Sequence, residues 1–193
     1  MKILIPVVGT LALIGVTAWL ITRESPYEWA LPPDLPPPAV PTDNPMSATK
    51  VELGRWLFYD KRLSGNETMS CASCHIQALA FTDGKPRSIG STGEIHPRSS
   101  MSLVNVAYAS RLTWANPLLD RLEDQALTPL LGDNPIEMGL GGSEDRFAEL
   151  LRSEAHYSSL VAEAFPADED PHSLLNGVRA IAAFVRTITS YNS

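Results

Sequence analysis

Two cysteines and a histidine constrain this chain more than any other feature of its sequence. Cys71 and Cys74 are its only cysteines, they are separated by two residues, and His75 follows directly. A disulfide between them would close a very small ring and restrict the unfolded chain little. A structural zinc site commonly needs two such pairs. A redox dithiol of the thioredoxin type needs a strand–helix–strand setting, which no segment here suggests.

The C-x-x-C-H spacing is instead typical of covalently attached haem c. The two thiols lie about one helical turn apart, as the two vinyl groups that they alkylate require, and the histidine can reach the iron from the same side. We therefore predict one covalent haem c, held by Cys71 and Cys74, with His75 as the proximal ligand of the iron.

The N-terminus predicts export, which this kind of attachment requires. Lys2 precedes an uncharged, apolar run from Ile3 to Ile21 that ends before Arg23. As a helix this run would be about 28 Å long, close to the ~30 Å core of a bilayer. Residues 1–22 are thus either an uncleaved membrane anchor or a signal peptide cut after Ala18. We expect a periplasmic protein, with residues 3–21 as its anchor to the inner membrane if they are retained.

Residues 23–45 contain eight of the sixteen prolines and few large apolar side chains. Such a composition favours extended polyproline geometry, so the segment is predicted to be a semi-rigid linker. Residues 46–193 form the predicted folded domain. The net charge of −7, with no basic cluster after Arg23, argues against a nucleic-acid partner.

Helical patterns dominate the folded region. The segment 47–60 carries Ser47 and Thr49 as candidate caps, with a capping box between Thr49 and Glu52. Near the C-terminus, Asp170 before Pro171 predicts a helix start, and apolar residues follow at helical spacing through 188. The segments 117–131 and 143–165 also have helical spacing, whereas 81–100 has none and is predicted to be a long loop. The expected class is all-α, a cytochrome c-like haem domain with long ordered loops.

Several motifs, taken in order, resemble one family. They are "LGRWLFYDKRLSGNETMSCASCH", "AFTDG", "SLVNVAYASRLTW", "LEDQALTPL" and "NPIEMG". Their series resembles the bacterial di-haem cytochrome c peroxidase and MauG family, specifically the N-terminal haem domain, over residues 46–193. The stretches "STGEIHPRSSMSLVNVAY" and "LTWANPLLDRLEDQAL" resemble the MbnH-like branch, whose members oxidise tryptophan in a partner protein.

The resemblance implies four residues around the reactive side of the haem. The glutamate of "NPIEMG" is Glu137, and the glutamine and proline of "DQALTP" are Gln125 and Pro129. Trp114 of "LTW" resembles the residue that relays electrons between two haems, although the surrounding sequence departs from the usual "FWDGR". A carboxylate near the iron can move a proton between the two oxygens of peroxide, which agrees with this role for Glu137.

Other residues compete for the sixth coordination position of the iron. His96 of "GEIHPRSS" is a candidate distal ligand, as a histidine is in resting forms of some family members. Met101 or Met138 would instead produce an electron carrier of high potential. Glu137 has a plainer interpretation as well, as a residue that caps a turn after Asn134 and Pro135.

The family normally carries two haems, and this chain has one C-x-x-C-H motif. A second haem domain is therefore expected to be missing or supplied by another chain. Ser99 occupies the position where the family's calcium ligand is usually asparagine, so we predict no calcium in this chain alone. Three functions follow as hypotheses. The first is reduction of hydrogen peroxide with electrons from a small cytochrome c or cupredoxin. The others are peroxide-dependent oxidation of tryptophan or tyrosine in a partner protein, and plain electron transfer.

Overall fold

The computed structural model describes residues 27–114 and 116–191, and its regular elements within these ranges are helices. They are α2 (Ala48–Tyr59), α3 (Cys71–Cys74), α4 (Leu122–Leu131), α5 (Glu144–Ser153), α6 (Ala155–Ala164) and α7 (Leu174–Arg186), with single 3-10 turns at Lys61–Leu63, Gln77–Leu79 and Val106–Tyr108. Extended backbone in the described ranges pairs only at isolated bridges. The predicted all-α class is confirmed for this part of the chain.

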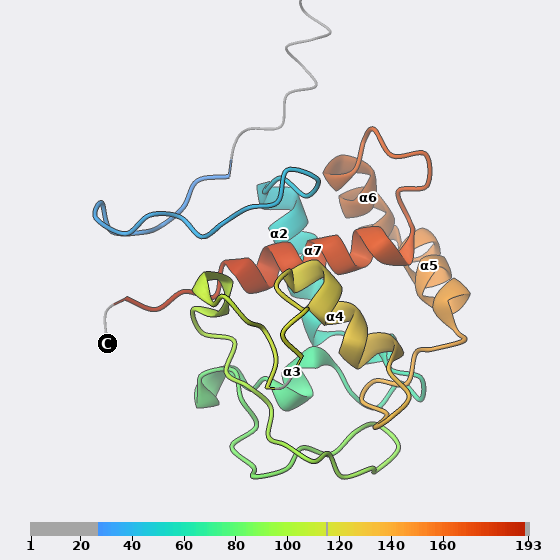
Figure 1. Ribbon diagram of the computed structural model, residues 1–193. Helices are drawn as coiled ribbons and strands as arrows, with labels where there is room; N and C mark the ends of the chain where they lie inside the picture. The colour runs from blue at the N-terminus through green and yellow to red at the C-terminus, as the bar shows by residue number, and fades with distance from the viewer. Residues whose placement is uncertain (1–26, 115, 192–193) are drawn as a thin grey trace, which may run out of the picture.

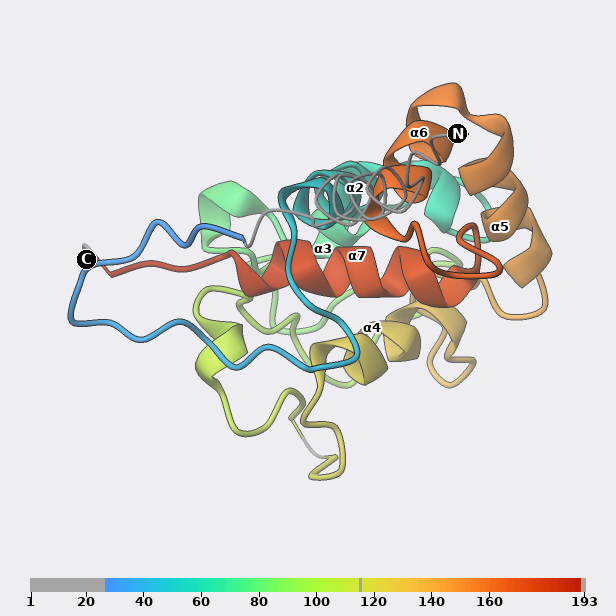
Figure 2. The ribbon, with the colours of Figure 1, turned by 90° about the horizontal axis from the view of Figure 1, so that it is seen from above.

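Helix α7 lies at the centre, between α2 on one side and α4 on the other (Figures 1 and 2). Most of its small and aliphatic side chains are almost fully buried, including Val178, Ala180 and Ile181. Gly54 of α2 allows the closest approach, because a Cβ there would overlap the carbonyl oxygen of Ala180. The two central helices therefore pack backbone to backbone and form the rigid support of the domain.

Helix α2 begins at Ser47, one of the two caps that were expected. Ser47 is the N-cap, and its Oγ accepts a hydrogen bond from the backbone N–H of Lys50 at 3.2 Å. Thr49 lies inside the helix and donates its hydroxyl to Glu163 of α6. The predicted capping box between Thr49 and Glu52 is therefore wrong, since Ser47 already satisfies the first turn.

Helix α7 starts later than predicted. Ser173 is its N-cap and accepts a hydrogen bond from the backbone N–H of Asn176, whereas Asp170 and Pro171 belong to the preceding turn. The side chain of Asn176 donates to Asp168 and so holds that turn against the helix. The expected start at Asp170 is wrong by three residues, because the later serine captures the first turn of the helix.

The segment predicted to be helical over 143–165 forms two helices that meet at Glu154, which is at once the C-cap of α5 and the N-cap of α6. Phe147 of α5 packs against Gly177 of α7, where a Cβ would overlap its ring. These two helices cover one end of α7 (Figure 1).

Residues 27–45 run along the outside of the helical domain (Figure 1). Their carbonyl groups accept hydrogen bonds from two tyrosines, Tyr108 to Pro36 and Tyr191 to Ala30. Asn44 is 1% exposed, and its amide donates to Glu123 of α4 and to the carbonyl of Arg179 of α7. The end of this segment is therefore attached to two helices of the domain.

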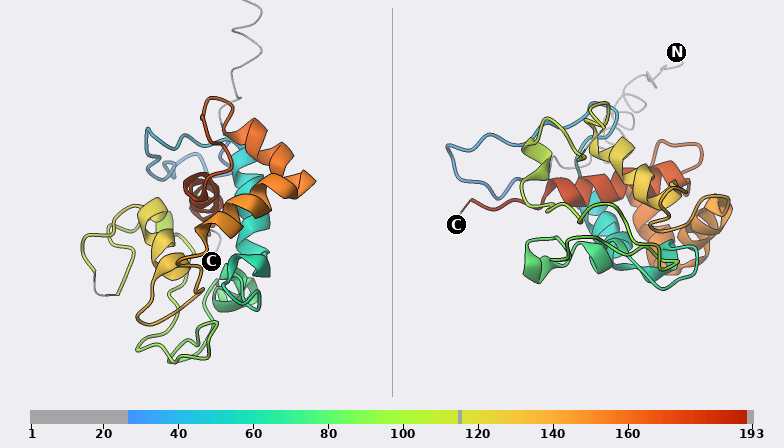
Figure 3. Two further views of the ribbon diagram at one scale, coloured as in Figure 1. Left: turned by 90° about the vertical axis from the view of Figure 1, so that its right-hand side faces the viewer. Right: turned by 60° about the horizontal axis from the view of Figure 1, so that its bottom comes forward.

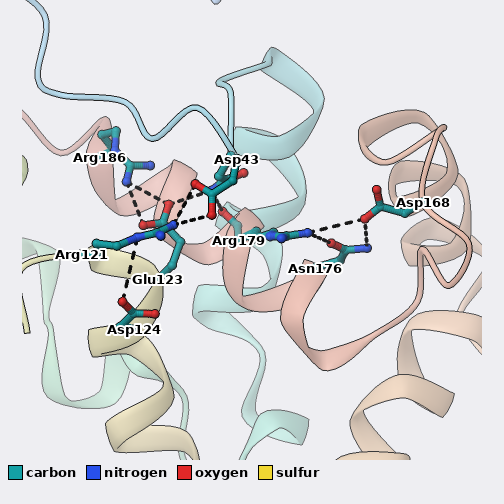
Figure 4. Close-up of polar contacts among 9 residues, drawn as sticks. Asp43, Arg121, Glu123, Asp124, Asp168, Asn176, Arg179 and Arg186 are labelled. Atoms are coloured by element: carbon teal, nitrogen blue, oxygen red, sulfur yellow. Dashed lines mark hydrogen bonds and ion pairs between the residues drawn. The ribbon is translucent and has the colours of Figure 1, made fainter.

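A polar network joins the same helices (Figure 4). Arg186 of α7 and Glu123 of α4 form a buried ion pair of 2.9 Å, with both side chains less than 5% exposed. At its edge, Arg121 makes two hydrogen bonds to Asp43. This network fixes α4 against α7.

Below the helices, the chain from residue 81 to residue 105 forms a long loop without helix (Figure 3). The loop predicted over 81–100 is thus confirmed and extends five residues further. Within residues 27–114 and 116–191, no helix has the length and apolar character needed to cross a membrane. The predicted anchor or signal segment, residues 1–22, lies outside the described residues.

Candidate haem-binding site

The C-x-x-C-H motif folds as a single helical turn. Helix α3 comprises Cys71–Cys74, and the backbone N–H of His75 closes the turn by donating to the carbonyl of Cys71 at 2.9 Å. Ser70 precedes the turn, and its backbone N–H donates to the Oγ of Ser73. The turn thus brings two free thiols and the histidine into one compact group.

The ring of His75 is oriented by the backbone. Its Nδ1 lies 2.8 Å from the carbonyl oxygen of Phe81, so Nδ1 carries the hydrogen and Nε2 keeps its lone pair. Ala80 and Phe81 both adopt positive φ angles, 55° and 57°, and this turn aims the carbonyl at the ring. Burial lowers the pKa of His75, although the hydrogen bonds to backbone carbonyls oppose that effect. A neutral imidazole with a free Nε2 is the form that binds iron.

A cavity of about 420 Å³ opens beside this turn. Its volume lies in the range of sites for cofactors and other small molecules, and its lining is mainly apolar. Phe58, Leu103, Val106, Ile181 and Val185 provide part of that apolar wall. All eight candidate site residues of the sequence line this one cavity: Cys71, Cys74, His75, His96, Trp114, Gln125, Pro129 and Glu137.

Both thiols are held in their protonated form. Burial raises the pKa of Cys71 to about 12, and the nearby charges of Cys74 and Glu137 add to this effect. Burial also raises the pKa of Cys74. As free thiols these groups are poor metal ligands and poor redox groups at neutral pH, since both roles need the thiolate.

Glu137 lies on the loop that follows α4, and its carboxyl group borders the cavity. Oε1 is 4.0 Å from Nδ1 of His96. Burial raises the pKa of Glu137, and the charge of a protonated His96 would partly reverse that. Its pKa is thus displaced toward neutral pH, which suits a group that takes up and returns a proton.

Helix α4 presents Gln125 and Pro129 to the cavity one turn apart. Pro129 has no N–H and so cannot donate to the carbonyl of Gln125, the position that an uninterrupted helix would satisfy. The carbonyl of Pro129 accepts from the N–H of Met138 at 2.8 Å, which ties the helix to the loop that carries Glu137.

Trp114 is placed at the rim of the cavity and is 55% exposed. Its indole N–H donates to the carbonyl of Ser99 at 3.0 Å.

The sequence did not reveal which residues hold the loop of Glu137 in place. The segment 88–96 packs on this loop through both backbone and side-chain groups. Ser91 N–H donates to the carbonyl of Glu137 at 2.7 Å, and Glu94 accepts from the N–H of Ile136 at 2.7 Å. Gly90 lies against the carbonyl of Ile136, where a Cβ would overlap it. The two glycines of "GSTGE" are the only local signal of such a tight turn.

The residues present fit a covalent haem c. Two protonated thiols one turn apart, a neutral histidine with Nε2 free, and an apolar cavity between them and α4 match the chemistry of attachment and ligation.

The comparison with known proteins agrees with a haem-binding site. The family model described as "Di-haem cytochrome c peroxidase" matches residues 48–193. The chain belongs to the di-haem cytochrome c peroxidase family. The family predicted from the motifs is thus confirmed, and the family implies haem c binding.

Individual relatives of the di-haem peroxidase family show the extent of the match. The chain is 41% identical to the cytochrome-c peroxidase IdrP1 of Denitromonas iodatirespirans, over 81% of this chain and 40% of the relative. It is 33% identical to the methylamine utilization protein MauG of Methylorubrum extorquens, over 78% of this chain and 41% of the relative. A crystal structure of a MauG-like protein associated with microbial copper homeostasis matches with a TM-score of 0.83 and 49% identity, over 86% of this chain and 48% of that one. The chain therefore spans less than half the length of these relatives.

Proposed function

We propose that this chain is an exported haem c domain that reduces hydrogen peroxide. One observation carries the proposal: the attachment motif, a candidate proton-transfer carboxylate and the α4 residues Gln125 and Pro129 all line the same apolar cavity. Residues 1–22 serve export or anchoring, 23–45 form the connecting segment, and 46–193 form the haem domain. The periplasm is the compartment in which such a protein works.

A haem bound through Cys71, Cys74 and His75 would supply the iron at which peroxide accepts two electrons and, with two protons, becomes two molecules of water. The protein positions the peroxide and moves its protons. Glu137 accepts a proton from the peroxide at its carboxylate and returns it to the departing oxygen. The side-chain amide of Gln125 offers one donor and one acceptor to orient the peroxide.

The electrons come from a small soluble redox protein, either a cytochrome c or a cupredoxin. Trp114, exposed at the rim of the cavity, is proposed as the relay to a second haem domain carried elsewhere. We propose one haem and no calcium in this chain.

Replacement of Glu137 tests this proposal. Glu137→Gln keeps the size of the side chain but removes the proton acceptor, so the rate of peroxide reduction should fall by roughly 10²–10⁴-fold while haem content stays the same. Glu169→Gln, an exposed carboxylate in the turn before α7, makes the same charge change away from the cavity and serves as the control. Equal rates in the Glu137 variant and the wild type would refute the mechanism.

A second candidate function is peroxide-dependent oxidation of tryptophan or tyrosine in a partner protein. It is favoured by the exposure of Trp114 beside the cavity and by the similarity to MauG and to the MauG-like protein. The MbnH-like placement belongs to this hypothesis. The two functions differ in substrate, so mass spectrometry of a candidate partner after addition of peroxide separates them. A partner protein that gains oxygen or a cross-link supports the second function.

A ferric haem that stays low-spin and six-coordinate, without reaction with peroxide, would instead indicate an electron-transfer cytochrome. Ligation by Met101 or Met138 would produce that state, and both residues line the cavity.

A further inference from the structure

His96 is a buried histidine in a segment without helix. It is 8% exposed, it lies in the loop 88–96, and it borders the cavity together with Glu137. A polar ring in such a place needs partners for its nitrogens, because burial without them is costly.

Both ring nitrogens of His96 face the loop that carries Glu137. Nε2 lies 3.3 Å from the carbonyl oxygen of Ile136, and Nδ1 lies 4.0 Å from Oε1 of Glu137. A carbonyl only accepts hydrogen bonds, so Nε2 carries the hydrogen in this arrangement and Nδ1 is left as an acceptor. The acceptor nitrogen is therefore the one directed at the carboxyl group.

The surrounding backbone fixes this pairing. A Cβ on Gly90 would overlap the carbonyl of Ile136 and lie only 3.2 Å from Nε2 of His96, so a glycine is needed beside this contact. The carboxylate of Glu94 accepts the N–H of Ile136 and ties the same loop to the segment 88–96. The backbone N–H of His96 donates to the carbonyl of Ser88 at 2.9 Å, which fixes the backbone that carries the ring.

We propose that His96 is a positioning residue for Glu137. Its Nε2–H holds the ring on the carbonyl of Ile136. Its Nδ1, 4.0 Å from Oε1 of Glu137, accepts the hydrogen of that carboxyl group once the carboxylate has taken up a proton, through one water or after a small shift of the side chain, and so fixes its orientation. The inference rests on the proposed function, in which Glu137 handles the protons of peroxide. It also assigns His96 a role other than coordination of iron, since both ring nitrogens are directed at protein atoms.

Two substitutions separate the roles of the two nitrogens. In His96→Asn the side-chain oxygen takes the place of Nδ1, so the acceptor for Glu137 is kept and the bond to Ile136 is lost. In His96→Gln the terminal amide takes the place of Nε2, so the bond to Ile136 is kept and the acceptor is lost. Each variant is the control for the other, and the haem content and the urea midpoint of both show whether they have folded.

The readouts are the rate of reaction with peroxide and the rate of cyanide binding to the ferric protein. Hydrogen cyanide must give up its proton when the anion binds iron, so its binding reports on the same proton acceptor without turnover. We expect His96→Gln to slow both reactions by roughly tenfold, as loss of a hydrogen bond to an ionisable group implies, and His96→Asn to slow them clearly less. In a Glu137→Gln background the same substitutions should have no further effect, because the coupled partner is gone.

Three results would overturn the inference. The opposite order, with the Asn variant slow and the Gln variant normal, would mean that His96 only anchors the loop. A change of the ferric spectrum from low-spin to high-spin in both variants would mean that His96 is an iron ligand. Equal effects in the presence and absence of Glu137 would show that the two residues are not coupled. Failure of the proposed function can be told apart from failure of this inference. The proposed function fails if Glu137→Gln alone leaves peroxide reduction unchanged. In that case the cyanide-binding rates of the two His96 variants still test the role of His96.

Discussion

His75 is oriented by a backbone carbonyl rather than by another side chain. The motif identifies the ligand from the sequence, but the acceptor at Phe81 depends on two consecutive residues with positive φ, neither of them glycine. No pattern of residue types predicts that geometry. The same holds for the loop of Glu137, whose partners are the backbone N–H of Ser91 and the side chain of Glu94.

Gly90 provides a test of this loop at the residue scale. A methyl group there would meet the carbonyl of Ile136, so Gly90→Ala should push the two loops apart and cost about 1–3 kcal/mol of unfolding free energy. Because Glu137 moves with its loop, peroxide reduction should fall while covalent haem remains. Stopped-flow rates and urea denaturation measure the two effects, and a variant with unchanged rate and stability would show that the loops do not touch in this way.

Asp60 links stability to pH. It accepts hydrogen bonds from Tyr157 at 2.6 Å and from Arg62. Burial alone would raise the pKa of Asp60, but these bonds and the charge of Arg62 outweigh it and lower the pKa. A depressed pKa in the folded state means that the stabilisation is complete above the unfolded pKa, about 3.9, and is lost as the pH falls through the folded pKa.

We therefore expect Asp60→Asn to reduce the free energy of unfolding by about 1–3 kcal/mol at neutral pH and to weaken the loss of stability in acid below about pH 4. Urea titrations at several pH values measure this, with the exposed Asp34→Asn as the control. Parallel pH curves for wild type and variant would contradict the role of Asp60.

At the scale of elements, periodicity predicted the helices well and their first residues poorly. The apolar repeat of α7 and the pattern of α4 are strong signals over several turns. The N-cap residue of a helix is harder to predict, because neighbouring serine, threonine and aspartate residues can each take that position and the sequence does not rank them. Ser173 prevails over Asp170 since Asn176 also ties the preceding turn, a contact that only the folded chain shows. Likewise, the pairing of α4 with α7 through Glu123 is not visible in the pattern of either helix.

That ion pair yields a prediction at the element scale. Glu123→Ala leaves Arg186 buried without its carboxylate, so the free energy of unfolding should fall by about 3–5 kcal/mol. Replacing both residues, Glu123→Leu with Arg186→Met, should restore most of the loss, since no buried charge is then left unpaired. Asp124→Ala, an exposed carboxylate on the same helix, should change stability by less than about 1 kcal/mol. Thermal and urea unfolding check all three, and a double variant as unstable as the single one would contradict this account.

At the scale of the whole molecule, the family and the gathering of the eight site residues at one cavity were within reach of the sequence, because the motifs occur in the order of known relatives. The contacts of residues 27–45 could not be predicted from the sequence. A proline-rich composition predicts extended backbone, and it does not reveal that Asn44 is buried between α4 and α7.

Truncation tests the attachment of this segment. A chain that starts at residue 41 keeps Asp43 and Asn44, whereas one that starts at residue 46 loses their bonds to Arg121 and Glu123. The shorter chain should be less stable by about 1–3 kcal/mol. Both are exported with the same heterologous signal and compared by urea denaturation, and equal midpoints would mean that residues 41–45 add nothing to the fold.

The central claim is that one haem is covalently bound at Cys71 and Cys74 with its reactive side next to Glu137. The most direct test is the visible spectrum of the purified protein after acid-acetone extraction, followed by addition of peroxide to the intact ferric protein. The account predicts pigment that stays with the polypeptide and a rapid spectral change with peroxide that is lost in Glu137→Gln. Pigment removed by the solvent, or a ferric spectrum indifferent to peroxide in the wild type, would contradict it.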